Sequence, residues 1–212
     1  MEYTITDFGA VGDGKTINTS VIQKAIDAAE KAGGGKVIVP TGVFVSGTIW
    51  LKDNVELHLQ PGAVLKASEN LDDYNKTEDY KQNWDCLHET WLGKHLIIIH
   101  EKKNVSITGC GTIDGNGEGF FAELEPKEYY DIVWSSGYSW SYGFVASKDT
   151  EKMRPGQMIS FIECENVRVL DVNLQNSPCW TCHIHGCNNV TIRGVHIYNK
   201  RYLGCTDGID ID

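Results

Sequence analysis

A short phrase that recurs along the chain restricts its fold more than any other feature. The phrase is Asn-Val followed by an alternating apolar segment, and it begins at Asn54, Asn104, Asn166 and Asn189. The last two asparagines lie 23 residues apart, and the first two lie 50 apart, about two such periods. A period in the low twenties, built from short alternating segments, is typical of a solenoid in which each repeat packs on its neighbours.

Each unit of this repeat is predicted to be a coil of short strands joined by tight turns. Leucine-rich repeats have a similar period but need a Leu-x-x-Leu-x-Leu frame, which this sequence lacks. Asparagine suits such a turn because it tolerates left-handed backbone angles and its amide can bond the same asparagine one coil away. We therefore predict an all-β fold, a right-handed parallel β-helix.

Residues 18–31 interrupt the β pattern and predict a short helix. Apolar residues recur at helical spacing, at Val21, Ile22, Ala25, Ile26 and Ala29. Asn18, Thr19 or Ser20 would cap its N-terminus, and the glycines at 33–35 would stop it. Such a helix before the first coil would cover the open end of the solenoid, which is otherwise an exposed sheet edge.

Residues 1–212 are predicted to form a single β-helix domain with two excursions that lack the repeat. One spans about 68–95 and holds Trp84 and Trp91, and the other spans about 116–157 and is rich in tryptophan and tyrosine. We interpret both as loops that leave a coil and return to it. Their aromatic rings either flank a cleft and stack on sugar faces or pack the loops against the solenoid.

Composition restricts the partners of the chain. The formal charge is −10, and no cluster of Lys and Arg offers a footprint for phosphates, which argues against nucleic acid. No apolar stretch approaches membrane-spanning length, and Met1 leads into polar sequence without a signal-peptide pattern. The seven cysteines cannot all pair with one another. We expect no nucleic-acid or membrane partner and a cytoplasmic location, or secretion if a leader has been removed.

The segment from Thr206 to Asp212 gathers three carboxylates on a predicted strand. Because side chains alternate along a strand, Asp210 and Asp212 should point to the same face, with Asp207 near the start of the strand. Carboxylates crowded in this way repel one another unless they bind a cation or take part in acid/base chemistry. This strand is therefore the first candidate for a functional site.

Four further stretches lie in order along the chain. They are Asp-Phe-Gly-Ala-Val-Gly-Asp-Gly at 7–14, Gly-Gly-Gly-Lys-Val-Ile-Val-Pro at 33–40, Asn-Ser-Pro-Cys-Trp-Thr at 176–181 and Thr-Asp-Gly-Ile-Asp at 206–210. Together they resemble the pectin-degrading glycoside hydrolases of family 28, the polygalacturonase group. The resemblance covers essentially the whole chain. Its opening segment is also shared by β-helical lyases and phage tailspikes, so the aspartate-bearing strand makes the match specific.

The resemblance implies inverting hydrolysis of galacturonide oligosaccharides. Long loops that close one end of the cleft would produce exo action, and we expect this of the 116–157 excursion. It makes Asp207 one of the carboxylates that activate water, and Asp210 a supporting residue that binds substrate. In such enzymes the acid and base carboxyl groups stand ~6.5–9.5 Å apart. Two departures matter, because the family's Asn before Thr-Asp is Cys205 here, and its later Asp-Asp, Gly-His-Gly and Arg-x-Lys motifs are absent. We therefore expect an N-terminal portion of an enzyme, truncated at its C-terminus and inactive alone.

Three more residues are predicted to bind substrate: His183, Trp180 and Arg154. Stacking of the coils places His183 beside Asp210, where it either contacts sugar or serves as a buried, hydrogen-bonded member of the stack. Trp180 belongs to the Asn-Ser-Pro coil of the resemblance. Arg154 ends a small basic cluster that suits a uronate carboxylate.

Cys179-x-x-Cys182, with two histidines close by, invites a zinc interpretation. Strand alternation sends these cysteines to opposite faces, however, so small apolar residues of the interior are the better interpretation. We predict no metal and no cofactor. The expected partner is a uronate-containing oligosaccharide, and the uncapped last coil predicts self-association.

Two other functions fit the same fold. A lyase or fructan transferase would use different chemistry on the same coils, and a lyase would release unsaturated products in a calcium-dependent reaction. A non-catalytic β-helix that binds or scaffolds glycans would bind oligosaccharides without turnover.

Overall fold

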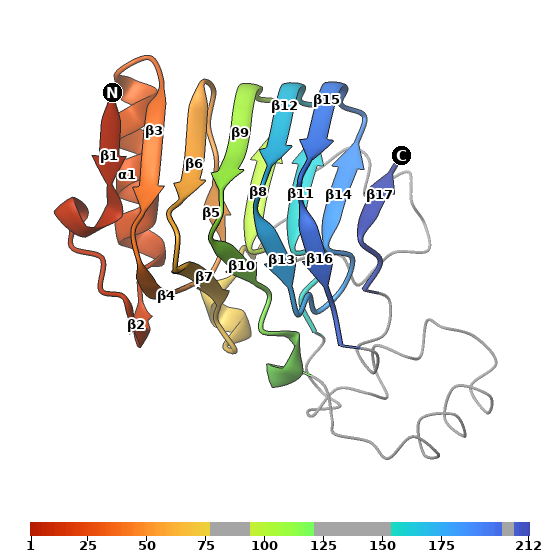
Figure 1. The fold of residues 1–212 in the computed structure, drawn as a ribbon, viewed down its shortest axis with the longest axis horizontal. Coiled ribbons are helices and arrows are strands. Elements are labelled where there is room, and N and C mark those ends of the chain that lie inside the picture. The colour runs from red at the N-terminus through yellow and green to blue at the C-terminus, as the bar shows by residue number, and fades with distance from the viewer. Residues whose placement is uncertain (77–93, 121–153, 201–205) are drawn as a thin grey trace.

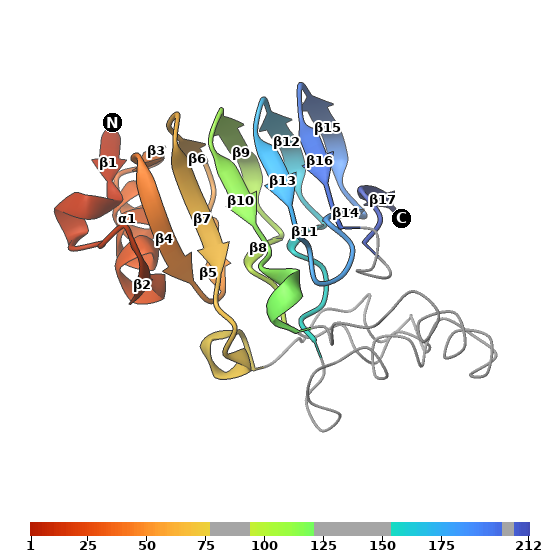
Figure 2. The same cartoon turned by 60° about the horizontal axis from the view of Figure 1, so that its bottom comes forward.

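The computed structural model describes residues 1–76, 94–120, 154–200 and 206–212. In these ranges the chain winds into a parallel β-helix whose strands stack into three parallel sheets (Figures 1 and 2). The predicted fold class is confirmed. No helix in the described ranges is long and apolar enough to cross a membrane.

Each coil after the first contributes one strand to each sheet, whereas in the first coil β2 is followed by a helix and not by a strand of sheet C. Sheet A contains, in spatial order, β1 (Glu2–Thr4), β3 (Gly35–Val39), β6 (Val55–Leu59), β9 (Lys103–Gly109), β12 (Glu165–Leu170) and β15 (Asn188–Arg193). Sheet B contains β2 (Asp13–Ile17), β4 (Gly42–Ser46), β7 (Ala63–Ala67), β10 (Thr112–Asp114), β13 (Asn173–Gln175) and β16 (His196–Tyr198). Sheet C contains β5 (Ile49–Trp50), β8 (Ile97–His100), β11 (Ile159–Ile162), β14 (Cys182–His185) and β17 (Ile209–Ile211).

Parallel register places equivalent residues of successive coils on top of one another. One interior stack of sheet A consists of aliphatic residues that pair in register from coil to coil: Val37, Leu57, Ile107, Val169 and Ile192. The first four are fully buried, and Ile192 is partly buried against them. Each such burial contributes roughly 1.5–3 kcal/mol, so these stacks supply the main driving force for coiling.

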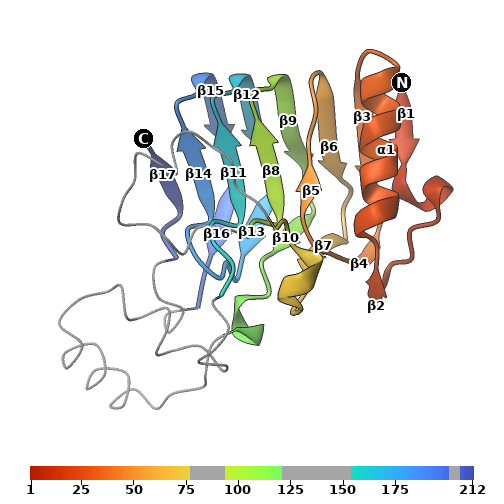
Figure 3. The same ribbon diagram turned by 180° about the vertical axis from the view of Figure 1, so that it is seen from behind.

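Helix α1 (Thr19–Lys31) covers the N-terminal end of the solenoid next to β1 and β3 (Figure 3). A 3₁₀ turn, η1 (Ile5–Phe8), and strand β2 precede it, and its buried face consists of Ile22, Ala25, Ile26 and Ala29. Gly33 has a φ of +89° and the Gly34 N–H donates to the Ala29 carbonyl at 2.9 Å, which ends the helix as predicted. The capping role of the helix is therefore confirmed.

The start of the helix differs from the prediction in one respect. Asn18 occupies the N-cap position, but its side chain makes no hydrogen bond to the helix. Its Oδ1 instead accepts from the Val11 N–H at 2.7 Å, and its Nδ2 donates to the Thr16 carbonyl at 2.6 Å. Asn18 is buried, so these bonds satisfy its amide while they tie the preceding loop to the helix.

The predicted asparagine ladder is present along one edge of sheet A. The amide Nδ2 of each asparagine donates to the Oδ1 of the one before it, at 2.8 Å for Asn104 to Asn54, 2.9 Å for Asn166 to Asn104 and 2.6 Å for Asn189 to Asn166. All four residues have φ between 56° and 59°, in the left-handed region that asparagine tolerates.

The two excursions leave the β-helix after a strand of sheet B. They lie between β7 and β8 and between β10 and β11, and each begins near a short 3₁₀ helix, η2 (Leu71–Asp73) and η3 (Gly117–Gly119) respectively. Trp84, Trp91 and most of the second excursion lie outside the described residues.

The apolar side chains of β17 are more exposed than their neighbours in the preceding coil. Ile209 is 42% exposed and Ile211 is 75% exposed, whereas their register partners Cys182 and Ile184 are buried. Self-association through this surface stays a prediction.

Candidate active site

The outer face of sheet C brings together most of the predicted site residues. Parallel register arranges them in two rows that cross successive coils, namely Ser160–His183–Asp210 and Ile162–His185–Asp212. On the preceding coils Trp50, Ile98 and Ile162 form an apolar patch on this face, next to the outward-facing His100. Asp210 and Asp212 then add carboxylates at the β17 end of the face, where the sequence predicted them.

His183 is the centre of the polar part of this face. The residue is 6% exposed, and its ring lies 5.3 Å from the ring of Trp180 and 5.3 Å from that of His185, edge-on in both cases. Its Nε2 hydrogen-bonds Oδ2 of Asp212 at 2.7 Å. Packing and this bond together fix the imidazole in one orientation.

Burial and charge act on His183 in opposite directions. Burial lowers the pKa of His183 below its ordinary value of 6.5, while the hydrogen bond and the charge of Asp212 partly offset that effect. The net lowering favours a neutral ring that donates its Nε2–H to the carboxylate. His183 thus matches the interpretation as a buried, hydrogen-bonded member of the stack, and a direct contact with sugar stays a prediction.

Asp207 lies just before β17, and its side chain is exposed to solvent. Two contacts fix the backbone around it. The Thr181 N–H donates to the Asp207 carbonyl at 2.8 Å, and the Asn199 Nδ2 donates to the Thr206 carbonyl at 2.8 Å. Asn199 also donates to Thr181 Oγ1 at 2.7 Å and accepts from the Ser177 N–H at 2.9 Å, so one side chain joins two coils.

Asn199 was missed by the sequence reasoning. It follows β16, outside the repeated phrase, and nothing in its local pattern distinguishes it from an ordinary turn residue. It acts as a positioning residue, because its amide fixes the segment that presents the Asp207 carboxylate.

Arg154 lies beneath the site rather than on its surface. Its side chain is 5% exposed, and its Nη1 donates to the Pro178 carbonyl at 2.6 Å. This bond supports the turn that precedes Trp180, whose own side chain is half-buried. A contact between Arg154 and a uronate carboxylate stays a prediction.

A second histidine that the sequence reasoning missed extends the polar network. His95 is buried, and its Nδ1 lies 2.8 Å from the Gln157 carbonyl and 3.1 Å from Ser160 Oγ. Because a carbonyl oxygen only accepts, Nδ1 carries the proton. His95 closes the first excursion just before the apolar strand β8, so its sequence context suggested a loop end rather than a site.

Among the described residues, no cysteine joins the histidines in a cluster of candidate metal ligands. Cys179 and Cys182 are both buried, and burial raises the pKa of the Cys182 thiol to about 12, which disfavours a metal-binding thiolate. In the described ranges, His183, His185 and Asp212 do offer ligand atoms within 4.8 Å of one another. The 2.7 Å bond already joins two of these three atoms, so we interpret the cluster as hydrogen-bonded rather than metal-binding.

Comparison with known proteins agrees with this geometry. The family described as Glycosyl hydrolases family 28 matches residues 34–212. An exo-poly-alpha-D-galacturonosidase from Dickeya chrysanthemi is 43% identical over 119 residues, which is 53% of this chain and 19% of that protein. The solved hyperthermoactive exopolygalacturonase of Thermotoga maritima is 29% identical with a TM-score of 0.69, over 94% of this chain and 47% of that one.

A third similar structure is the family 28 exopolygalacturonase of Yersinia enterocolitica. It is 25% identical with a TM-score of 0.71, over 100% of this chain and 41% of that one. The chain thus spans less than half the length of each of these three relatives.

Proposed function

This chain belongs to glycosyl hydrolases family 28, and on that premise we propose that it takes part in the inverting hydrolysis of galacturonide oligosaccharides. The observation that supports this best is the exposed carboxylate of Asp207, set at the start of β17 beside the row that holds His183 and Asp210. Because the chain spans less than half the length of the three relatives named above, the activity of the whole protein remains part of the proposal.

Inverting hydrolysis needs one carboxylic acid to protonate the leaving oxygen and one carboxylate to take a proton from water. We assign the second role to Asp207. Its side chain reaches solvent, so water can approach it, while the bonds of Thr181 and Asn199 restrict the backbone around it. Such preorganisation raises the rate because the reacting groups need not be ordered again at each turnover.

The neighbouring side chains have supporting roles. Asp210 is half-buried and in register with His183, where its carboxylate can accept hydrogen bonds from sugar hydroxyls. Trp180 offers an aromatic edge and face next to His183, and sugar C–H groups pack well on such rings. His183 and Asp212 hold each other in place and position this surface.

Exo action is the finer part of the proposal. The names of the Dickeya, Thermotoga and Yersinia relatives describe exo-acting enzymes, and these names are its support. Time courses of product size on polygalacturonate test it directly, because an exo enzyme releases short products from the start while the polymer shortens slowly.

Asp207→Asn tests the catalytic role. General acid/base groups contribute about 10²–10⁴-fold, so we expect a loss of that size in the release of reducing ends from polygalacturonate. Asp27→Asn is the matched control, because Asp27 lies exposed on α1 at the other end of the solenoid. The assay is run on the 212-residue chain and, if the native polypeptide is longer, on that polypeptide.

Three results would contradict the proposal. They are full activity of Asp207→Asn, retention of anomeric configuration in products followed by NMR, and release of unsaturated products that absorb in the ultraviolet. The last result would indicate a lyase.

A further inference from the structure

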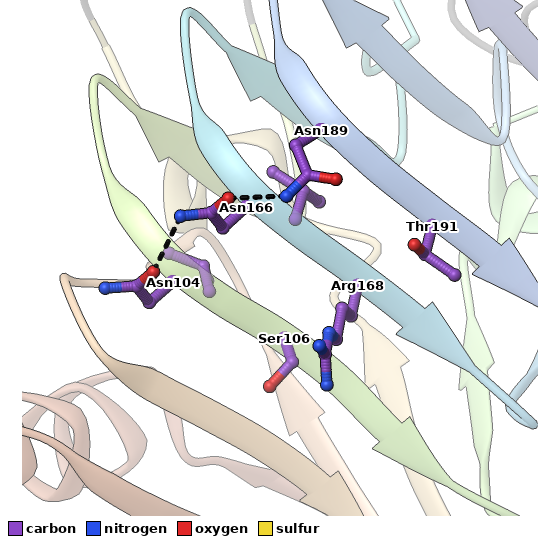
Figure 4. A pocket seen from close by; sticks show the side chains of 8 residues that line it. Asn104, Ser106, Asn166, Arg168, Asn189 and Thr191 are labelled. Atoms are coloured by element: carbon purple, nitrogen blue, oxygen red, sulfur yellow. Dashed lines mark hydrogen bonds between the residues drawn. The ribbon is translucent and has the colours of Figure 1, made fainter.

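A second polar groove lies on the outer face of sheet A, on a different sheet from the candidate active site. It has a volume of about 340 Å³, and we call it the sheet A groove. The inward-facing Val105 and Val167 lie beneath it. Six polar residues complete its lining: Asn104, Ser106, Asn166, Arg168, Asn189 and Thr191 (Figure 4).

Register sets the spacing of the polar groups along the groove. Arg168 on β12 pairs with Ser106 on β9 and with Thr191 on β15, so a hydroxyl-bearing residue lies on each side of Arg168, whose guanidinium points toward Ser106 (Figure 4). Adjacent strands are ~4.8 Å apart, so the three side chains form a row that runs along the solenoid axis. A linear ligand that lies along this axis would meet one polar group per coil.

The asparagine ladder forms the opposite side of the groove (Figure 4). Its bonds of 2.9 and 2.6 Å fix the amide orientations of Asn104, Asn166 and Asn189. Each amide has two N–H groups, and the ladder uses one of them. The groove therefore offers ordered amide donors that face a row of hydroxyl and guanidinium groups.

Arg168 has no carboxylate partner in the described ranges, although the chain carries a formal charge of −10. The carboxylates of the same face are held elsewhere. Glu56 lies 3.3 Å from Lys36 Nζ, and Glu165 lies 2.7 Å from Lys103 Nζ. Arg168 is exposed within the groove, so its fork of N–H donors is available to a ligand carboxylate.

We propose that the sheet A groove is a second, non-catalytic binding site for acidic oligosaccharides. Arg168 pairs with a sugar carboxylate, while Ser106, Thr191 and the ladder amides bond sugar hydroxyls. The choice of galacturonide as ligand rests on the proposed function, whereas the groove itself is independent of Asp207. None of the described residues that line the groove is aromatic, so we expect a dissociation constant of about 1 mM for a short oligomer.

Weak binding at this site would still matter for a polymer. When one part of a polysaccharide is held on sheet A, the effective concentration of its other parts at the candidate active site on sheet C is raised. The groove would thus keep the enzyme on polymeric substrate between turnovers.

The test is a titration of the ¹⁵N-labelled chain with a short oligogalacturonate, followed at the Arg168 Nε–H signal by NMR. Arg168→Gln removes the charge, and Arg193→Gln is the matched control, because Arg193 lies on the same sheet in register with Leu170, outside the groove. Hydrogen bonds to charged groups contribute ~1.5–3 kcal/mol, so the affinity for the oligogalacturonate should fall about 10–100-fold in Arg168→Gln. The NMR signals of Ser106 and Thr191 report the affinity in that variant. The affinity of Arg193→Gln should stay unchanged.

Several outcomes would overturn the proposal. One is equal affinity of Arg168→Gln and the unchanged chain. Another is equal weakening by both substitutions, which would indicate general charge attraction. A third is equally tight binding of a neutral oligosaccharide of the same length. Asp207→Asn should leave the Arg168 response intact, so failure of the catalytic proposal and failure of the groove are distinguishable.

Discussion

Replacement of Asn166 offers a direct test of how the asparagine ladder stabilises the solenoid. Asn166 lies in the ladder interior, where its amide donates to Asn104 at 2.9 Å and its oxygen accepts from Asn189 at 2.6 Å. Its φ of 59° is a second, independent constraint. Glycine at this position removes the hydrogen bonds and adopts the same φ without strain, whereas alanine removes them and adds backbone strain.

The two contributions have different sizes. A hydrogen bond contributes about 0.5–1.5 kcal/mol net, and these two lie at the surface, so we expect Asn166→Gly to cost about 1–2 kcal/mol. The left-handed conformation costs alanine roughly 1–2 kcal/mol, and glycine loses about 0.4–1 kcal/mol through the greater freedom of its unfolded chain. Asn166→Ala should therefore be less stable than Asn166→Gly by roughly 0.5–1 kcal/mol.

Urea denaturation followed by far-ultraviolet circular dichroism measures both differences through the midpoint and slope. Asn189→Gly is the control, because Asn189 makes one recorded ladder bond instead of two and should cost about half as much. The reasoning fails if Asn166→Gly is as stable as the unchanged chain, or if Asn166→Ala is the more stable of the two variants.

Three further predictions concern the candidate active site. Asn199→Ala removes the bonds to Thr206 and Thr181. The Thr181 amide donates to the Asp207 carbonyl, and its hydrogen should exchange with deuterium faster in this variant. An unchanged exchange rate would show that Asn199 does not position this segment. Asp212→Asn removes a charge that raises the pKa of His183, so NMR titration should give a still lower pKa. The pKa of His183 is lower in the folded chain than the ordinary value of 6.5, so the unfolded chain binds the proton first as the pH falls. The free energy of unfolding should therefore decrease as the pH falls below 6.5. A flat stability profile between pH 7 and 5 in an otherwise folded chain would contradict the assignment.

The repeat predicted the architecture because one physical constraint determines both. Stacked coils of nearly equal length must return the same residue type to the same place, so the Asn-Val phrase marks sheet A, and its asparagines form the ladder. The capping helix was equally accessible from sequence. Its apolar spacing and its terminal glycines are local signals, which can be recognised in the sequence without knowledge of tertiary contacts.

The side-chain partners in the site were not accessible in the same way. Register placed His183 beside Asp210 in the backbone, as predicted, yet its ring bonds Asp212, one outward position further along. Diagonal neighbours in a sheet are close enough to compete with direct ones, and the side-chain rotamer decides between them. Arg154 shows the same limit, because no sequence pattern indicated that its guanidinium would be buried against the Pro178 carbonyl.

One coil joins the candidate active site to the sheet A groove. Strand β12 carries Arg168 outward on sheet A, and β14 of the same coil carries His183 outward on sheet C, while the interior residues between them belong to one buried core. Arg168 and Asp207 lie on different faces and share no side-chain partner in the described residues, so substitutions at these two positions should act independently. An interior substitution such as Val169→Ala instead leaves a cavity beneath both faces. If an interior variant loses both hydrolysis and ligand binding in the sheet A groove, the loss reflects damage to the coil. Only substitutions of outward-facing residues test one site separately from the other.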